Sequence, residues 1–122
     1  MTEQNTNNSL PYLDDFLLNL QTNNYSNETI YNYERDLKVF EDFLSEMKLN
    51  FKKVDKLAIN RYKAYLTSID RKTAEKQKGE KKLQSRSINR NLSSLRSYLK
   101  YLIEMDLPCP IAPEAVKLVR TE

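Results

Sequence analysis

Residues 85–105 carry arginines, serines and an asparagine at a spacing that gathers them on one side of a helix. At roughly 100° per residue, one group of side chains falls together: Arg86, Arg90, Ser93 and Ser97. This group is flanked by Asn89, Arg96 and Lys100. No acidic residue occurs in the stretch before Glu104. A helix face that is merely solvated usually alternates acids with bases four residues apart, so a face that is basic throughout is typical of a surface that binds phosphate groups.

The chemistry open to these side chains is hydrogen bonding to nucleic acid. Arginine and lysine pair with phosphate oxygens, and arginine also bridges the edge of guanine through two hydrogen bonds. Serine and asparagine are short donors that let a helix lie close to a backbone or groove, although a surface asparagine is more often only solvated. Arg86 and Arg90 rank first because they share the centre of the face. The predicted contacts on this stretch are Arg86, Ser87, Asn89, Arg90, Ser93, Arg96, Ser97 and Lys100.

The opposite side of the same stretch is apolar. Its residues recur at steps of four and three, which is the repeat of one helical face: Ile88, Leu92, Leu95, Leu99 and Leu102. Ser85 is placed to cap the start of this helix. Prolines from Pro108 onward prevent it from extending far beyond Asp106. The sequence therefore predicts a helix with one buried side and one basic side.

Two further helices are predicted before residue 48. Residues 10–21 repeat apolar side chains at helical spacing, with Pro11 tolerated in the first turn. After a loop at 22–25, Ser26 caps a second helix that runs to about Met47. The residues of this second helix that are expected to face the core are Ile30, Tyr33, Leu37, Phe40, Leu44 and Met47.

The outer side of the second helix offers a weaker set of contacts. Ordinary solvation is the simpler explanation of this side, whose members include Tyr31, Arg35, Lys38 and the acid Asp42. The acid makes the C-terminal half of the helix less suited to DNA, so the first two turns are the better candidates. The predicted contacts there are Thr29, Tyr31, Asn32 and Arg35.

A third helix is predicted from a cap at Asp55 to about Ile69. Its apolar side would consist of Leu57, Ile59, Tyr62, Leu66 and Ile69, and the aromatic residues Tyr62 and Tyr65 are expected in the core or at its rim.

Residues 70–84 are rich in lysine and almost free of apolar side chains, which favours a flexible loop or a frayed extension of the helix. The stretch is either a solvated run of charges or a set of phosphate contacts that read no sequence. In the second case the contacts are Lys78, Lys81 and Lys82.

The composition argues against catalysis within these 122 residues. The chain has no histidine, one cysteine and one glycine, so it can form no histidine base or ligand, no internal disulfide and no glycine-rich phosphate loop. We expect no metal, no cofactor and no catalytic residue. A net charge of +3 favours a nucleic-acid partner only weakly. No apolar run approaches the ~20 residues of a membrane span and no signal-peptide pattern is found, so a cytoplasmic protein is expected.

The predicted fold class is all-α, a compact bundle of four to five helices. The length suits one domain, and the helical patterns extend over residues 10–119. Residues 1–9 lack any periodicity and are expected to form a disordered, flexible tail. A last short helical turn is expected at 114–119, which leaves residues 120–122 as the start of a linker.

Two segments of the chain resemble a known family. Residues 26–30, followed by Tyr33, Asp36-Leu37 and Phe40, resemble the second helix of the core-binding domain of tyrosine recombinases, the phage integrase and Xer family. Residues 85–98, followed by Tyr101-Leu102, are similar to the fourth helix of that domain. The resemblance extends from about residue 10 to 118. The chain departs from the family at Ala112-Pro113, where an asparagine often precedes the proline, and in the length of its lysine-rich stretch.

The resemblance implies a SAM-like helical domain that forms half of a C-shaped clamp around double-stranded DNA. Its second and fourth helices would approach the major groove of a recombination site. Catalysis would belong to a following domain, absent from this sequence, which supplies arginines, a lysine, histidine and the nucleophilic tyrosine. The partners implied are duplex DNA and other recombinase protomers, as a tetramer in the full-length protein, whereas the isolated domain is expected to be a monomer. The alternative is a helical protein-interaction module that uses the same basic face on an acidic partner.

Overall fold

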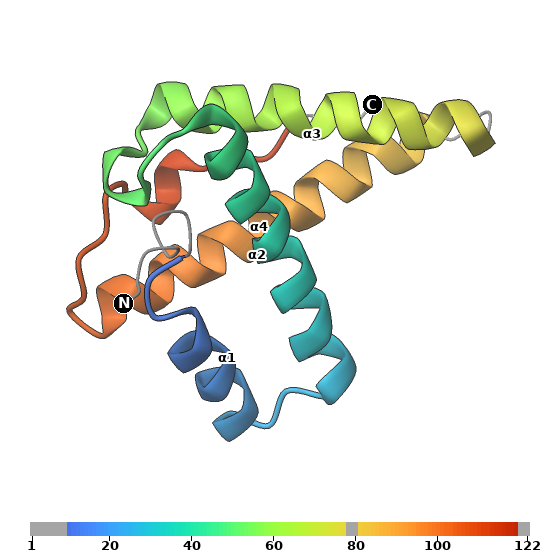
Figure 1. Ribbon diagram of the computed structural model, residues 1–122. Helices are drawn as coiled ribbons and strands as arrows, with labels where there is room; N and C mark the ends of the chain where they lie inside the picture. Colours follow the sequence, from blue (N-terminus) through green and yellow to red (C-terminus); the bar gives the residue numbers. More distant parts are fainter. Residues whose placement is uncertain (1–9, 78–80, 120–122) are drawn as a thin grey trace, which may run out of the picture.

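The computed structural model describes residues 10–77 and 81–119, and side chains are described for 10–68 and 86–119 (Figure 1). The elements in chain order are α1 (Leu13–Thr22), α2 (Asn27–Met47), the short 3-10 helix η2 (Phe51–Lys53), α3 (Lys56–Gln77), α4 (Lys81–Glu104) and the 3-10 helix η3 (Pro113–Ala115). The described residues form no strand, and the prediction of an all-α bundle is confirmed. None of the described helices combines the length and apolar character that crossing a membrane requires.

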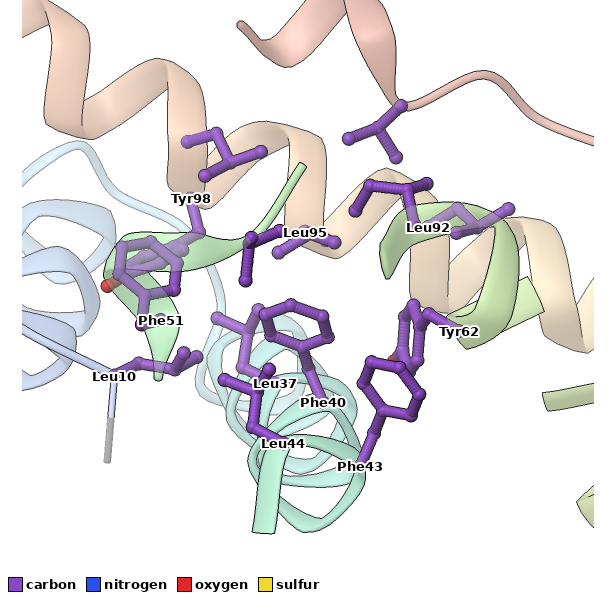
Figure 2. Packing of buried hydrophobic residues seen from close by; sticks show 14 of the residues in the cluster. Leu10, Leu37, Phe40, Phe43, Leu44, Phe51, Tyr62, Leu92, Leu95 and Tyr98 are labelled. Atoms are coloured by element: carbon purple, nitrogen blue, oxygen red, sulfur yellow. The ribbon is translucent and has the colours of Figure 1, made fainter. Parts of the chain in front are cut away.

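Helix α4 is the centre of the bundle, since it contacts α1, α2, α3 and η3. Figure 1 shows α2 crossing α4 near its middle, with α3 lying along one side of the bundle and α1 on the other. The apolar stripe predicted for α4 is buried at every position, from Ile88 to Leu102. Figure 2 shows Leu92 and Leu95 of this stripe facing Leu37, Phe40 and Phe43 of the crossing helix.

The start of α2 is the one that the sequence predicts. Ser26 has an extended backbone, and its Oγ accepts a hydrogen bond of 3.1 Å from the backbone N–H of Thr29. Such a cap satisfies one of the N–H groups that a helix leaves free in its first turn. The helix ends at Met47, as predicted, where Lys48 takes a left-handed conformation with φ 52°.

The lysine-rich stretch is the main correction to the predicted elements. Helix α3 does not stop at Ile69 but continues to Gln77, and α4 begins at Lys81, so Ser85 lies inside the helix and does not cap it. Alanine, glutamate, lysine and glutamine have high helix propensity, so a helix continues through them without an apolar stripe. Of the two predicted forms, the backbone at 70–77 takes the helical one, and residues 78–80 lie outside the described part.

Several other expectations differ in detail. Met47 and Leu57 do not face the core, because they are 46% and 55% exposed. Met47 is the last residue of α2, and Leu57 lies roughly 140° around α3 from the buried Tyr62, so Phe43 and Ala58 occupy the core in their place. Helix α1 begins at Leu13 and not at residue 10, since Tyr12 has a left-handed φ of 60°. The expected turn at 114–119 is the shorter η3.

Two buried tyrosines connect the elements of the core. Tyr62 of α3 packs against Phe40 with the ring centroids 4.8 Å apart, and its hydroxyl has no hydrogen-bond partner among the described residues. The hydroxyl of Tyr98, on α4, donates to the carbonyl oxygen of Pro11 and so holds the segment before α1 against α4. Burial raises the pKa of both phenols above the ordinary 10.0.

These shifts predict the dependence of stability on pH. The folded state holds the Tyr62 and Tyr98 protons at pH values where the unfolded chain releases them, so the free energy of unfolding is unaffected by them below about pH 10 and falls above it. Each phenol contributes up to about 1.4 kcal/mol per pH unit in that alkaline range. Urea unfolding followed by circular dichroism between pH 8 and 11.5 measures the fall.

The matched controls are Tyr62→Phe and Tyr98→Phe, each of which should make the alkaline fall shallower. Phenolate absorbance at 295 nm should show that the last phenols ionise only as the helices unfold. Ionisation of all eight tyrosines with one midpoint near pH 10, in a chain that stays helical, would contradict the burial described here.

Candidate nucleic-acid interface

A buried carboxylate lies where α2 crosses α4. Asp36 of α2 is 2% exposed, yet it follows the helical spacing of the core residues around it. Its Oδ2 accepts hydrogen bonds from Arg90 Nε at 3.3 Å and from Ser94 Oγ at 2.8 Å, and its Oδ1 accepts one from Arg90 Nη2 at 3.1 Å. A carboxylate removed from water needs such partners, because an unpaired buried charge is strongly destabilising. The three bonds join α2 to α4 across the middle of the bundle.

Arg90 is only partly free to meet a ligand. The sequence places it at the centre of a solvent-facing group, whereas the structure pairs one edge of its guanidinium with Asp36. Its side chain is 49% exposed, so the pairing with Asp36 leaves about half of it accessible to solvent. A guanidinium has five N–H donors and this pair uses two of them. Arg90 therefore belongs both to the junction of α2 with α4 and to the outer surface.

Apart from Arg90, the exposed residues of the predicted α4 face form a row at intervals of seven residues, consisting of Arg86, Ser93 and Lys100. Side chains two helical turns apart share one side of a helix, so the row follows the axis of α4. Arg96 is half-buried beside it. None of the four takes part in an ion pair within the described residues.

Two predicted contact residues of α4, Asn89 and Ser97, have side-chain partners within the fold, and a third, Ser87, is half-buried. The side-chain amide of Asn89 donates to the carbonyl oxygen of Val119 at 3.1 Å and accepts from the Val119 N–H at 2.8 Å. These two bonds hold the segment after η3 against α4. The Oγ of Ser97 lies 3.4 Å from the hydroxyl of Tyr33 on α2, and Ser87 is half-buried, with its carbonyl oxygen accepting from Asn91.

The predicted α2 residues lie in its first turns, as expected. Tyr31 is exposed, and the guanidinium of Arg35 lies 5.8 Å from the centre of its ring, a cation–π arrangement. Thr29 and Asn32 are half-buried, and the Thr29 hydroxyl accepts from Ser26 Oγ at 2.9 Å. Lys38 pairs with Glu34 one turn earlier at 3.8 Å, as an ordinary solvated helix pair does.

The lysines predicted as phosphate contacts are only partly placed. Lys78 lies outside the described residues. Lys81 and Lys82 lie in the first turn of α4, and their side chains are outside the described part. Their role stays a prediction.

Sequence reasoning missed Asp36 and Ser94 as members of this site. The available signal was an acid inside an apolar stripe, since Asp36 stands three residues after Tyr33 and four before Phe40 on the face that packs inward. An acid at such a position calls for a cationic partner from another helix. In the described residues, no group of three or more acids or cysteines is arranged to hold a metal ion.

The Asp36–Arg90 pair predicts that replacing different arginines of α4 changes the free energy of unfolding by different amounts. Arg90→Ala leaves Asp36 buried with Ser94 as its one remaining side-chain donor and should lower the free energy of unfolding by about 2 kcal/mol. Arg86→Ala removes an exposed cation and should change it by less than about 0.5 kcal/mol. Urea denaturation of the two variants at pH 7 measures the difference. Equal stability of the two would mean that the Asp36–Arg90 pair does not hold the helices together.

Comparison with known proteins identifies the fold family. Residues 13–105 match the family described as phage integrase, N-terminal SAM-like domain. The tyrosine recombinase XerC of Leptospira interrogans (serogroup Icterohaemorrhagiae, serovar copenhageni, strain Fiocruz L1-130) is 37% identical over 84 residues, which are 69% of this chain and 24% of the relative. The tyrosine recombinase XerD of Rickettsia conorii (strain ATCC VR-613 / Malish 7) is 35% identical over 78 residues, which are 64% of this chain and 22% of the relative.

The chain thus spans about a quarter of the length of these curated relatives. No solved structure gives a significant match. The match to the family covers the greater part of the chain and includes all four α-helices. The chain belongs to the phage integrase N-terminal SAM-like domain family.

Proposed function

We propose that residues 10–119 bind double-stranded DNA as the core-binding half of a clamp formed by a site-specific tyrosine recombinase. The observation that carries the proposal is the exposed row on α4, in which Arg86 and Lys100 stand with Ser93 between them and no acid on the helix before Glu104. Such a surface neutralises phosphate charge and gives an affinity that depends on salt. The relatives named tyrosine recombinase support the same assignment.

In this proposal α4 docks on the duplex and α2 approaches beside it. Arg86 and Lys100 contact phosphates, and Ser93 is short enough to let the helix lie close to the backbone. Tyr31 and Arg35 reach the duplex from the first turns of α2. Asn89 is assigned to the segment around Val119 and not to a base, because both ends of its amide are already bound.

The chemistry of strand exchange lies outside this chain in our proposal. The chain corresponds to about a quarter of each relative, so we assign cleavage and rejoining of DNA to a catalytic domain that follows residues 120–122. The 122 residues themselves bind and do not catalyse, and other recombinase protomers assemble on the same DNA in the cytoplasm, as a tetramer for the full-length protein. The isolated chain is a monomer that binds weakly. No specific observation favours the alternative of a protein-interaction module with an acidic partner.

The proposal is tested by the affinity of the chain for a fluorescein-labelled 30-base-pair duplex, measured by anisotropy between 50 and 200 mM salt. The plot of log affinity against log salt should slope downward, and the double variant Arg86→Ala/Lys100→Ala should flatten it by about two units, since each lost phosphate contact removes roughly 0.9. Affinity at low salt should fall by about tenfold or more.

The matched control is Lys52→Ala/Lys53→Ala, which removes the same charge from η2. The control should bind almost as the parent does. Equal affinity of the two double variants would show that net charge and not the α4 face determines binding. Failure of the parent chain to bind any duplex at low salt would refute DNA binding altogether.

A further inference from the structure

The pairing of Arg90 with Asp36 fixes the direction of a guanidinium at the surface. Two bonds, from Nε and Nη2, meet the two oxygens of one carboxylate. A two-point pair of this kind sets the plane of the guanidinium as well as its position. The opposite edge, which carries both hydrogens of Nη1 and the second hydrogen of Nη2, is left without a partner among the described residues, on a side chain that is 49% exposed as a whole.

The carboxylate that orients Arg90 is itself held in the core. Asp36 is buried among the core residues of α2, and Ser94 donates to one of its oxygens at 2.8 Å. Ser94 is 5% exposed, so it cannot touch a ligand on the surface. An arginine on a free stem loses rotamer entropy when it binds a phosphate, whereas an arginine held in place has lost it already on folding.

We propose that Asp36 and Ser94 are positioning residues that hold Arg90 with its outer guanidinium edge presented to a DNA phosphate. This inference rests on the proposed function and adds to it a pair of residues that act through Arg90 without touching DNA. A phosphate accepts two parallel N–H bonds from a planar fork, which suits the free edge of Arg90. Phosphate contacts fix the position of a protein on the duplex, so the arrangement would set how α2 and α4 sit on DNA.

The sign of one substitution separates this role from simple electrostatics. Asp36 is negative, so its charge by itself repels the phosphates of DNA. Asp36→Asn removes that charge, and a purely electrostatic effect would therefore tighten binding. If Asp36 orients Arg90, the same substitution weakens binding although the chain has become more positive.

The experiment uses the 122-residue chain and the same mixed-sequence 30-base-pair duplex at 50 mM salt. Asp36→Asn should bind about tenfold more weakly than the parent and should lower the salt slope by about one unit, as Arg90→Ala does. The matched control Asp42→Asn removes an exposed acid from the same helix and should bind as tightly as the parent or slightly more tightly. Binding by a folded Asp36→Asn variant at or above the level of Asp42→Asn overturns the inference.

A double-mutant cycle gives a second measurement, which distinguishes positioning of Arg90 from a purely structural role of Asp36. In an Arg90→Ala background there is no guanidinium to orient, so adding Asp36→Asn should raise affinity or leave it unchanged. Asp36→Asn should thus lower the affinity for DNA when Arg90 is present, but not when Arg90 is absent. The same loss in both backgrounds would contradict positioning through Arg90.

Two milder variants decide the matter if Asp36→Asn does not fold. Ser94→Ala removes one bond to Asp36 without changing charge and should weaken DNA binding by about threefold. Arg90→Lys keeps the charge but not the fork, and should bind like Arg90→Ala. Parent-like affinity of both variants overturns the inference.

Absence of binding by the parent chain refutes the proposed function and this inference together, whereas parent binding with unaffected variants refutes the inference alone.

Discussion

The buried carboxylate of Asp36 is the interaction on which the arrangement of α2 and α4 depends. Its bonds to Arg90 and Ser94 join the two helices at their crossing, in addition to the contact between the hydroxyls of Tyr33 and Ser97. The apolar contacts of the crossing tolerate small rotations of one helix on the other, whereas a two-point pair between a guanidinium and a carboxylate does not. The pair therefore fixes which residues of each helix face outward together.

Polar residues of α4 divide into those that hold the bundle and those that remain on the surface. Asn89 binds the segment around Val119, and Ser94 binds Asp36, so both contribute to the fold. Arg86 and Lys100 have no such partner in the described part of the chain and face solvent. Arg90 belongs to both groups. A helix pattern alone treats all of these residues as one polar face. In the structure, α2 covers one flank of that face and the segment around Val119 covers the other, so the residues on the flanks are bound and those between them face solvent.

Much of the fold could be predicted because it is encoded locally. The apolar stripe of α4 and the Ser26 cap of α2 each depend on a few neighbouring residues, and both are confirmed. The Asp36–Arg90 pair joins residues 54 positions apart, so it follows from the crossing of two helices and not from any local pattern. The boundaries of α3 and α4 were wrong because the apolar stripe ends before helix propensity does.

Whether Asp36 holds Arg90 in place for DNA is tested most directly by the nitrogen–proton NMR spectrum of the arginine side chains, recorded with and without duplex DNA. If Asp36 holds Arg90, the Nε–H signal of Arg90 in the free chain should be distinct and protected from exchange with water, unlike that of the exposed Arg35. The Nη signals of Arg90 should then shift on addition of DNA while the Nε–H signal keeps its protection. An Arg90 signal that exchanges as freely as that of Arg35, or that does not respond to DNA, would contradict the account.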